Sequence, residues 1–173
     1  MNSQPAETKG DFSPIGKGST FDAISYWAIV AGVYLMVGGL MFYSGKEKLF
    51  DGDSHAPAGI QEQFAHSFLH VFPGTDAAWM ILGILEFGVF LLLLASFVTG
   101  EFLPHRPKRL MQTGLAVSLV TFACLAFGQT ATGNHEGSAS LYTYFGSTVV
   151  ILILVSLLPP NRGDRWLSFE SAD

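Results

Sequence analysis

Glu86 is the residue whose type and position most directly suggest chemistry. It is the single charged residue in the apolar segment 77–98. In a helix that begins near 77 it lies roughly 14 Å along the axis, close to the middle of a bilayer. An ionised carboxylate there costs on the order of 3 kcal/mol, so we expect Glu86 to face the bundle interior and to be protonated, paired or hydrated.

Two roles for Glu86 follow from that position. As a catalytic group, it would accept a proton or face a quinone. As a structural group, it would be a protonated carboxyl bonded to a Ser, Thr or Tyr of a neighbouring helix. The sequence leaves both open, because the apolar segments offer no second carboxyl to pass a proton to.

Further candidate residues lie in the first loop, which runs from about 44 to 76. Lys46 and Lys48, at the end of the first apolar segment, are candidates for attracting an anionic substrate. Glu62, His66 and His70 repeat at four-residue intervals. Two imidazoles one helical turn apart can share a metal ion, with the carboxylate as a third ligand. The same spacing is also typical of the polar face of an amphipathic helix.

Several kinds of chemistry are excluded or disfavoured. The single cysteine, Cys124, rules out an internal Cys-x-x-Cys redox pair. No histidine falls inside an apolar segment, which argues against integral haem held between facing helices. No phosphate-binding loop and no trio of nucleophile, base and orienting group is visible. Whether the chain is an enzyme stays open, and quinone is the candidate cofactor.

Composition indicates that these residues are positioned by membrane-spanning helices. The chain has 49% hydrophobic and only 13% charged residues. The apolar residues form four blocks, at about 24–43, 77–98, 110–127 and 142–158, each near the length that crosses a bilayer. We predict an all-α integral membrane four-helix bundle over 23–159, with tails at 1–22 and 160–173.

The placement of positive residues predicts the orientation. Seven of the nine Lys and Arg residues fall in the N-terminal tail, the loop between the second and third spans, and the C-terminal tail. Positive residues are retained in the cytoplasm, so both termini are predicted to be cytoplasmic, in a multi-pass protein of a bacterial inner membrane. The formal net charge of −5 argues against nucleic acid as a partner.

The first outside loop, from about 44 to 76, is predicted to contain structure of its own, since a simple connection would be shorter. Phe64, Phe68 and Phe72 recur at four-residue intervals. With the Glu62, His66 and His70 stripe, they predict an amphipathic helix over 60–72 that lies in the outer interface or over the mouth of the bundle.

Two short patterns resemble the DoxX-like superfamily of small four-helix membrane proteins. Gly45, Lys48 and Leu49 match the Gly and Lys-Leu pattern that ends the first helix in that family. Gly83, Glu86 and the leucines 91–94 match its Gly-x-x-Glu-like segment. The resemblance covers roughly residues 26–158. It implies a role beside membrane redox systems, among whose members is a quinone-reducing thiosulfate oxidoreductase.

Three functions are compatible with these patterns. The leading one is an accessory subunit of a membrane respiratory or redox assembly, which contacts the bilayer and either other membrane subunits or further copies of itself. The first alternative is a quinone-linked oxidoreductase subunit that uses Glu86. The second is a small oligomeric transporter or channel around a path lined by Glu86.

Overall fold

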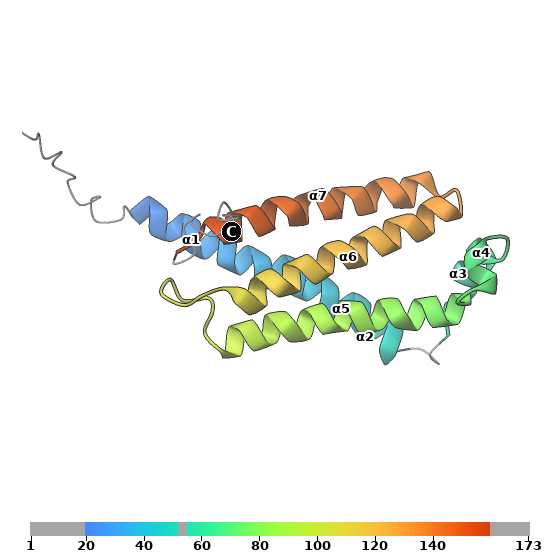
Figure 1. Cartoon of the computed structure of the whole chain (residues 1–173), viewed down its shortest axis with the longest axis horizontal. Coiled ribbons are helices and arrows are strands. Elements are labelled where there is room, and N and C mark those ends of the chain that lie inside the picture. The colour runs from blue at the N-terminus through green and yellow to red at the C-terminus, as the bar shows by residue number, and fades with distance from the viewer. Residues whose placement is uncertain (1–19, 52–54, 160–173) are drawn as a thin grey trace, which may run out of the picture.

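The computed structural model describes residues 20–51 and 55–159, and the predicted terminal tails fall largely outside these ranges. Within them the chain is helical, and no strand occurs. In chain order the elements are α1 (Thr20–Gly32), η1 (Val33–Gly38), α2 (Gly39–Leu49), α3 (Ala58–Phe64), α4 (Phe68–Val71), α5 (Thr75–Val98), α6 (Arg109–Ala131) and α7 (His135–Leu157). This confirms the predicted all-α class (Figure 1).

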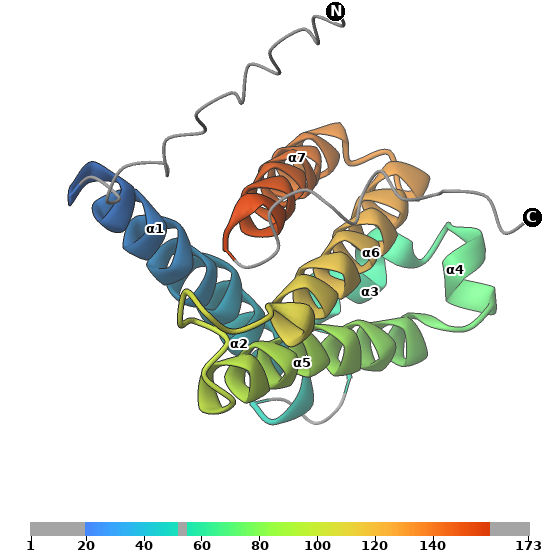
Figure 2. The same cartoon turned by 60° about the vertical axis from the view of Figure 1, so that its left-hand side comes forward.

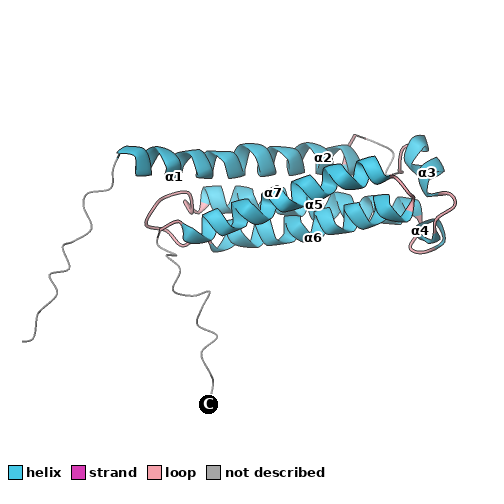
Figure 3. Cartoon of the chain, turned by 90° about the horizontal axis from the view of Figure 1, so that it is seen from above, coloured by secondary structure: helices cyan, strands magenta, loops and turns pink. Residues whose placement is uncertain are grey.

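Four stretches of helix are long and apolar enough to cross a bilayer. They are Ala23–Leu49, Thr75–Val98, Arg109–Ala131 and His135–Leu157. They run side by side, while α3 and α4 lie together at one end of the bundle (Figure 3). The start of α1, the end of α7 and the loop between α5 and α6 lie at the other end (Figure 3). These helices support a multi-pass membrane protein.

The first spanning helix is longer than its apolar block. It passes through the π-helical segment η1 without a break and ends at Leu49. Lys46 and Lys48 therefore lie in α2, which corrects the expectation that they belong to the first loop. The helix can include Lys48 because that ammonium group has a carboxylate partner inside the bundle.

The bundle core is formed by residues of η1, α2, α5, α6 and α7. Its buried residues include Val37, Met41, Val89, Leu93 and Leu115. The helices α2 and α5, α5 and α6, and α6 and α7 form the most extensive pairs, whereas α7 touches α1 only slightly. In the oblique view of Figure 2, α7 lies beside α6 and, for most of its length, apart from α1. Among the described residues, no helix covers a wide face of α7.

The first loop contains two short helices in place of the single one predicted over 60–72. After α3 ends at Phe64, the chain turns, and α4 covers only Phe68–Val71. The Ser67 side chain donates to the Phe64 carbonyl at 2.8 Å, closing this turn. The four-residue repeat of histidines therefore does not continue along one helical face.

Candidate functional site: a buried ion pair

Glu86 forms a buried ion pair with Lys48. The Lys48 Nζ atom lies 2.8 Å from Glu86 Oε2 and 3.2 Å from Oε1. Their side chains are 7% and 3% exposed, respectively. A pair so far removed from solvent persists only when each charge is compensated and hydrogen-bonded. Of the three states that the sequence left open for this carboxyl, protonated, paired or hydrated, the structure has the paired one.

Two glycines bring the helices close enough for this pair. A Cβ atom on Gly45 would lie 2.7 Å from the backbone nitrogen of Phe87. A Cβ atom on Gly83 would lie 2.8 Å from Lys48 Cβ. Each glycine therefore sits where α2 and α5 are in direct contact, one on each helix. The glycines of the two sequence patterns are thus the residues that permit the close approach.

Other groups complete the environment of Lys48. Its Nζ atom donates to the Ser44 hydroxyl at 2.7 Å, one helical turn earlier on α2. It also lies 4.7 Å from the centre of the Trp79 ring, a favourable cation–π position. The ammonium group therefore has a carboxylate, a hydroxyl and an aromatic face around it.

Neither Ser44 nor Trp79 was singled out from the sequence. Trp79 lies seven residues before Glu86. A tryptophan near the end of a membrane span is expected in the interfacial aromatic belt, so its presence did not suggest a polar partner. Its spacing from Glu86, about two helical turns, was the available signal that both side chains share one face of α5.

Lys46 has a different environment from Lys48. It bonds to both carboxylate oxygens of Asp51, at 2.8 and 2.7 Å. Both side chains are more than 40% exposed, so this pair contributes little to stability. The structure therefore brings Lys48 to Glu86 and leaves Lys46 at the surface.

The three residues considered for a metal site are not gathered into one. Glu62 lies on α3, His66 in the turn and His70 on α4. The His70 Nδ1 atom lies 3.4 Å from the Thr75 hydroxyl. Across 20–51 and 55–159, no group of three or more His, Cys, Asp or Glu side chains could hold a metal ion. The geometry gives the proposed metal site no support.

A second buried polar cluster lies at the opposite end of the bundle, and the sequence did not indicate it. Glu101 accepts hydrogen bonds from the backbone N–H groups of Leu110 and Met111, at 3.0 and 2.9 Å. It also accepts from the Ser96 hydroxyl at 2.9 Å. The carboxylate therefore caps the start of α6, where free N–H groups and the helix dipole favour a negative charge.

Lys108 belongs to the same end of the bundle and is fully buried. Its Nζ atom donates to the carbonyl of Pro159 at 2.6 Å and to that of Arg106 at 3.2 Å. Burial lowers the pKa of Lys108, and the charge of Glu101 partly opposes that shift. This lysine ties the loop before α6 to the end of α7.

Comparisons with known proteins found no relative. No family model matches the chain, and neither the curated proteins nor the solved structures yielded a match. The resemblance to the DoxX-like superfamily therefore stays a prediction that rests on its short patterns. The structure adds that Lys48 of the first pattern contacts both Gly83 and Glu86 of the second, across α2 and α5.

Proposed function

We propose that this chain is an accessory subunit of a membrane redox assembly, a DoxX-like protein of a bacterial inner membrane with both termini in the cytoplasm. The observation that carries the accessory role is the Lys48–Glu86 pair. The carboxylate in the middle of α5 is neutralised within its own chain, as a bundle-locking residue would be. The redox association is inferred from the family resemblance.

The position of the basic residues relative to the helix ends supports the proposed orientation. Three basic residues, Arg106, Lys108 and Arg109, lie at the α5–α6 connection, at the same end of the bundle as the start of α1 and the end of α7 (Figure 3). The tails that continue from those helix ends carry the other four of the seven basic residues. The predicted cytoplasmic charges thus belong to one side of the bundle.

The docking surface for a partner is assigned to the open face of α7. Only 17% of the most apolar stretch of α7 is buried, compared with 39% for α6. Val150, Ile153 and Leu157 are among its exposed apolar side chains, and they recur three or four residues apart along one side of the helix. This face would receive a helix of another subunit.

Isolation from the native membrane tests the accessory role. The tagged chain would be extracted in mild detergent and its stoichiometric companions identified by mass spectrometry. We expect dehydrogenase, oxidase or cytochrome subunits. Ile153→Trp on α7 should reduce their recovery, whereas Ile84→Trp, on an exposed position of α5, should not. Recovery of the chain alone, as a homo-oligomer, would contradict the accessory role.

A second candidate function, a quinone-linked oxidoreductase subunit, is favoured by one observation. Trp79, which contacts Lys48, also lines an apolar cavity between α5 and α6. A quinone in that cavity would be separated from the ion pair by the Trp79 side chain, so proton exchange with Glu86 would run through a water molecule or follow a displacement of that ring.

Paired variants separate the two candidates. Glu86→Gln leaves the Lys48 charge buried without a counter-charge, so it should lower membrane abundance for a structural reason. Lys48→Met combined with Glu86→Met should restore abundance. If the double variant then retains quinone-dependent electron transfer in the isolated assembly, Glu86 is not the proton-transferring group; loss of transfer at normal abundance would favour the quinone-linked role.

A further inference from the structure

An apolar cavity of about 250 Å³ lies between α5 and α6, beneath α3 and α4. Residues of α5 and α6 form its walls, among them Trp79, Leu82, Leu85 and Leu125. Ile60 and Phe64 of α3 and Leu69 of α4 contribute from the loop. It is partly open at the surface of the bundle, where hydrocarbon chains of the bilayer have access.

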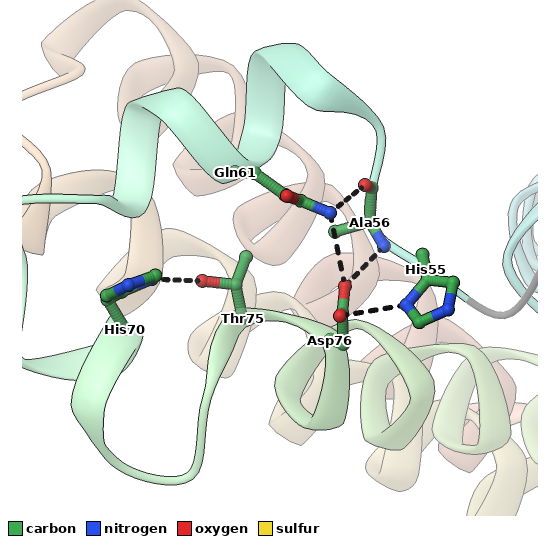
Figure 4. Close-up of polar contacts among 6 residues, drawn as sticks. All are labelled: His55, Ala56, Gln61, His70, Thr75 and Asp76. Carbon is green, nitrogen blue, oxygen red and sulfur yellow. Dashed lines mark hydrogen bonds and ion pairs between the residues drawn. The ribbon is translucent and has the colours of Figure 1, made fainter.

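A polar hollow adjoins this cavity. Pro73 and Thr75 line both spaces, and the hollow is completed by groups that include Gln61, His70 and Asp76. Figure 4 shows Gln61 and Asp76 on one side of Thr75 and His70 on the other. The two spaces together therefore have an amphipathic lining, almost wholly apolar between the helices and mixed polar and apolar beneath the loop.

The polar groups of the hollow suit an uncharged head. The Asp76 carboxylate already accepts from the Ala56 N–H at 2.8 Å and lies 2.9 Å from His55 Nδ1. The Gln61 amide nitrogen donates to the Ala56 carbonyl at 2.9 Å, and His70 Nδ1 lies 3.4 Å from the Thr75 hydroxyl. The Gln61 carbonyl oxygen, the second His70 ring nitrogen and the remaining capacity of the Thr75 hydroxyl can face a ligand. Among the described residues that line the two spaces there is no Lys or Arg, so a phosphate head would be desolvated without a cation.

The loop that covers the cavity is held in place by specific contacts. Gln63 of α3 donates to Gln129 and to Thr132 at the end of α6, both at 2.8 Å. The Phe64 ring lies against Gly128, where an added Cβ would be 3.4 Å from the ring. These contacts fix α3 over α6 and leave the space beneath it as a formed cavity.

We propose that these adjoining spaces are a binding site for a membrane amphiphile, with one hydrocarbon chain in the apolar cavity and an uncharged, hydrogen-bonding head in the polar hollow. The site requires neither electron transfer nor a partner subunit, so it goes beyond the accessory role; it uses the same cavity in which the second candidate function places a quinone. Burial of the chain against aromatic and aliphatic side chains supplies affinity, and the Thr75 hydroxyl, His70 and Gln61 supply selectivity for the head.

Tryptophan fluorescence tests the site, because Trp79 is one of its walls. The full chain with Trp27→Phe and Trp166→Phe keeps Trp79 as its one tryptophan. It would be placed in nanodiscs of unbrominated phosphatidylcholine and titrated with a monoacylglycerol whose chain is dibrominated. We expect quenching that saturates at a low mole fraction. Quenching that only rises in proportion to the mole fraction, as for bulk lipid, would overturn the proposal.

Two variants control for the position of the probe. Cys124→Phe places a ring at the wall of the cavity and should weaken saturable binding roughly tenfold or more. Ala116→Phe adds the same ring to an exposed position of α6 away from the site and should leave binding unchanged. Equal binding by both variants would overturn the assignment to this cavity.

The head selectivity is tested by competition with unbrominated amphiphiles. A long-chain alcohol or a monoacylglycerol should displace the probe, and Thr75→Val should weaken binding roughly fivefold, as expected for one lost hydrogen bond. Lysophosphatidic acid of the same chain length should compete poorly. Equal displacement by this anionic lipid would contradict the uncharged head. Mass spectrometry of the amphiphiles that copurify then distinguishes a quinone from a glycerolipid.

Discussion

Two regions of the bundle each bury an acid and a base, but they use them differently. Near the loop end, Lys48 and Glu86 meet directly across two helices at 2.8 Å. At the opposite end, Glu101 and Lys108 are each satisfied mainly by backbone groups. In the first region, a carboxylate and an ammonium group neutralise each other. In the second, the charged side chains form hydrogen bonds with backbone groups at the helix ends.

This difference predicts how each region responds to substitution. A direct pair leaves an uncompensated charge when one partner is removed, and it becomes dispensable when both are removed. Removal of a capping carboxylate leaves only neutral N–H groups unpaired. This loss costs less free energy than an unpaired buried charge, and removal of the base does not restore it. The loop end should therefore show strong coupling between its two residues and the opposite end weak coupling.

The largest effect is expected from Gly45→Val, because it acts on the helix contact that creates the pair. The added Cβ would lie 2.7 Å from the Phe87 backbone nitrogen, so α2 and α5 must separate. We expect a loss of about 5 kcal/mol in the free energy of unfolding, or no folded protein. Gly39→Val is the control, because no atom lies within 4 Å of its added Cβ. Equal thermal stability of the two variants in detergent would refute the role of Gly45.

The next largest effect concerns the pair itself. Lys48→Met and Glu86→Met should each lower the free energy of unfolding by about 3–5 kcal/mol, whereas the double variant should recover most of that loss. Denaturation in mixed detergent micelles measures all three. Additive losses in the double variant would show that the two side chains act independently, contrary to the observed geometry.

A smaller loss is expected for Glu101→Gln. The amide keeps a carbonyl acceptor, but the charge at the start of α6 and one of its acceptor sites are removed, at a cost of about 2 kcal/mol. Combining Glu101→Gln with Lys108→Met gives the coupling energy between these two residues. This energy should be well below the coupling energy between Lys48 and Glu86. A comparable coupling energy at both ends would remove the distinction between the two regions.

The smallest effect is expected at the start of α7. The Asn134 side chain accepts from the N–H of Gly137 at 3.0 Å, so Asn134→Ala should cost about 1 kcal/mol. Asn134→Asp keeps an acceptor, so it should retain most of the stability. Hydrogen exchange at the first turn of α7 provides the local measurement, and unchanged exchange in Asn134→Ala would show that this cap does not stabilise the turn.

The helical class and the number of apolar helices were determined by the sequence alone. An apolar block of about 20 residues satisfies its own backbone groups only as a helix when it lies in a bilayer, and this holds for each block independently of the others. Glu86 was also identified as a residue that must face inward, because the cost of an exposed carboxylate depends on depth and not on the partner.

Which groups meet inside the bundle was decided by the tertiary structure. The pairing of Glu86 with Lys48, and not with Lys46, depends on the contact of Gly45 and Gly83 across two helices that are distant in sequence. The buried positions of Glu101 and Lys108, between the second and third apolar blocks, depend on the ends of α6 and α7 that surround them. Periodicity records which face of a helix is apolar, but it holds no information on which neighbour covers that face, so these contacts required the structure.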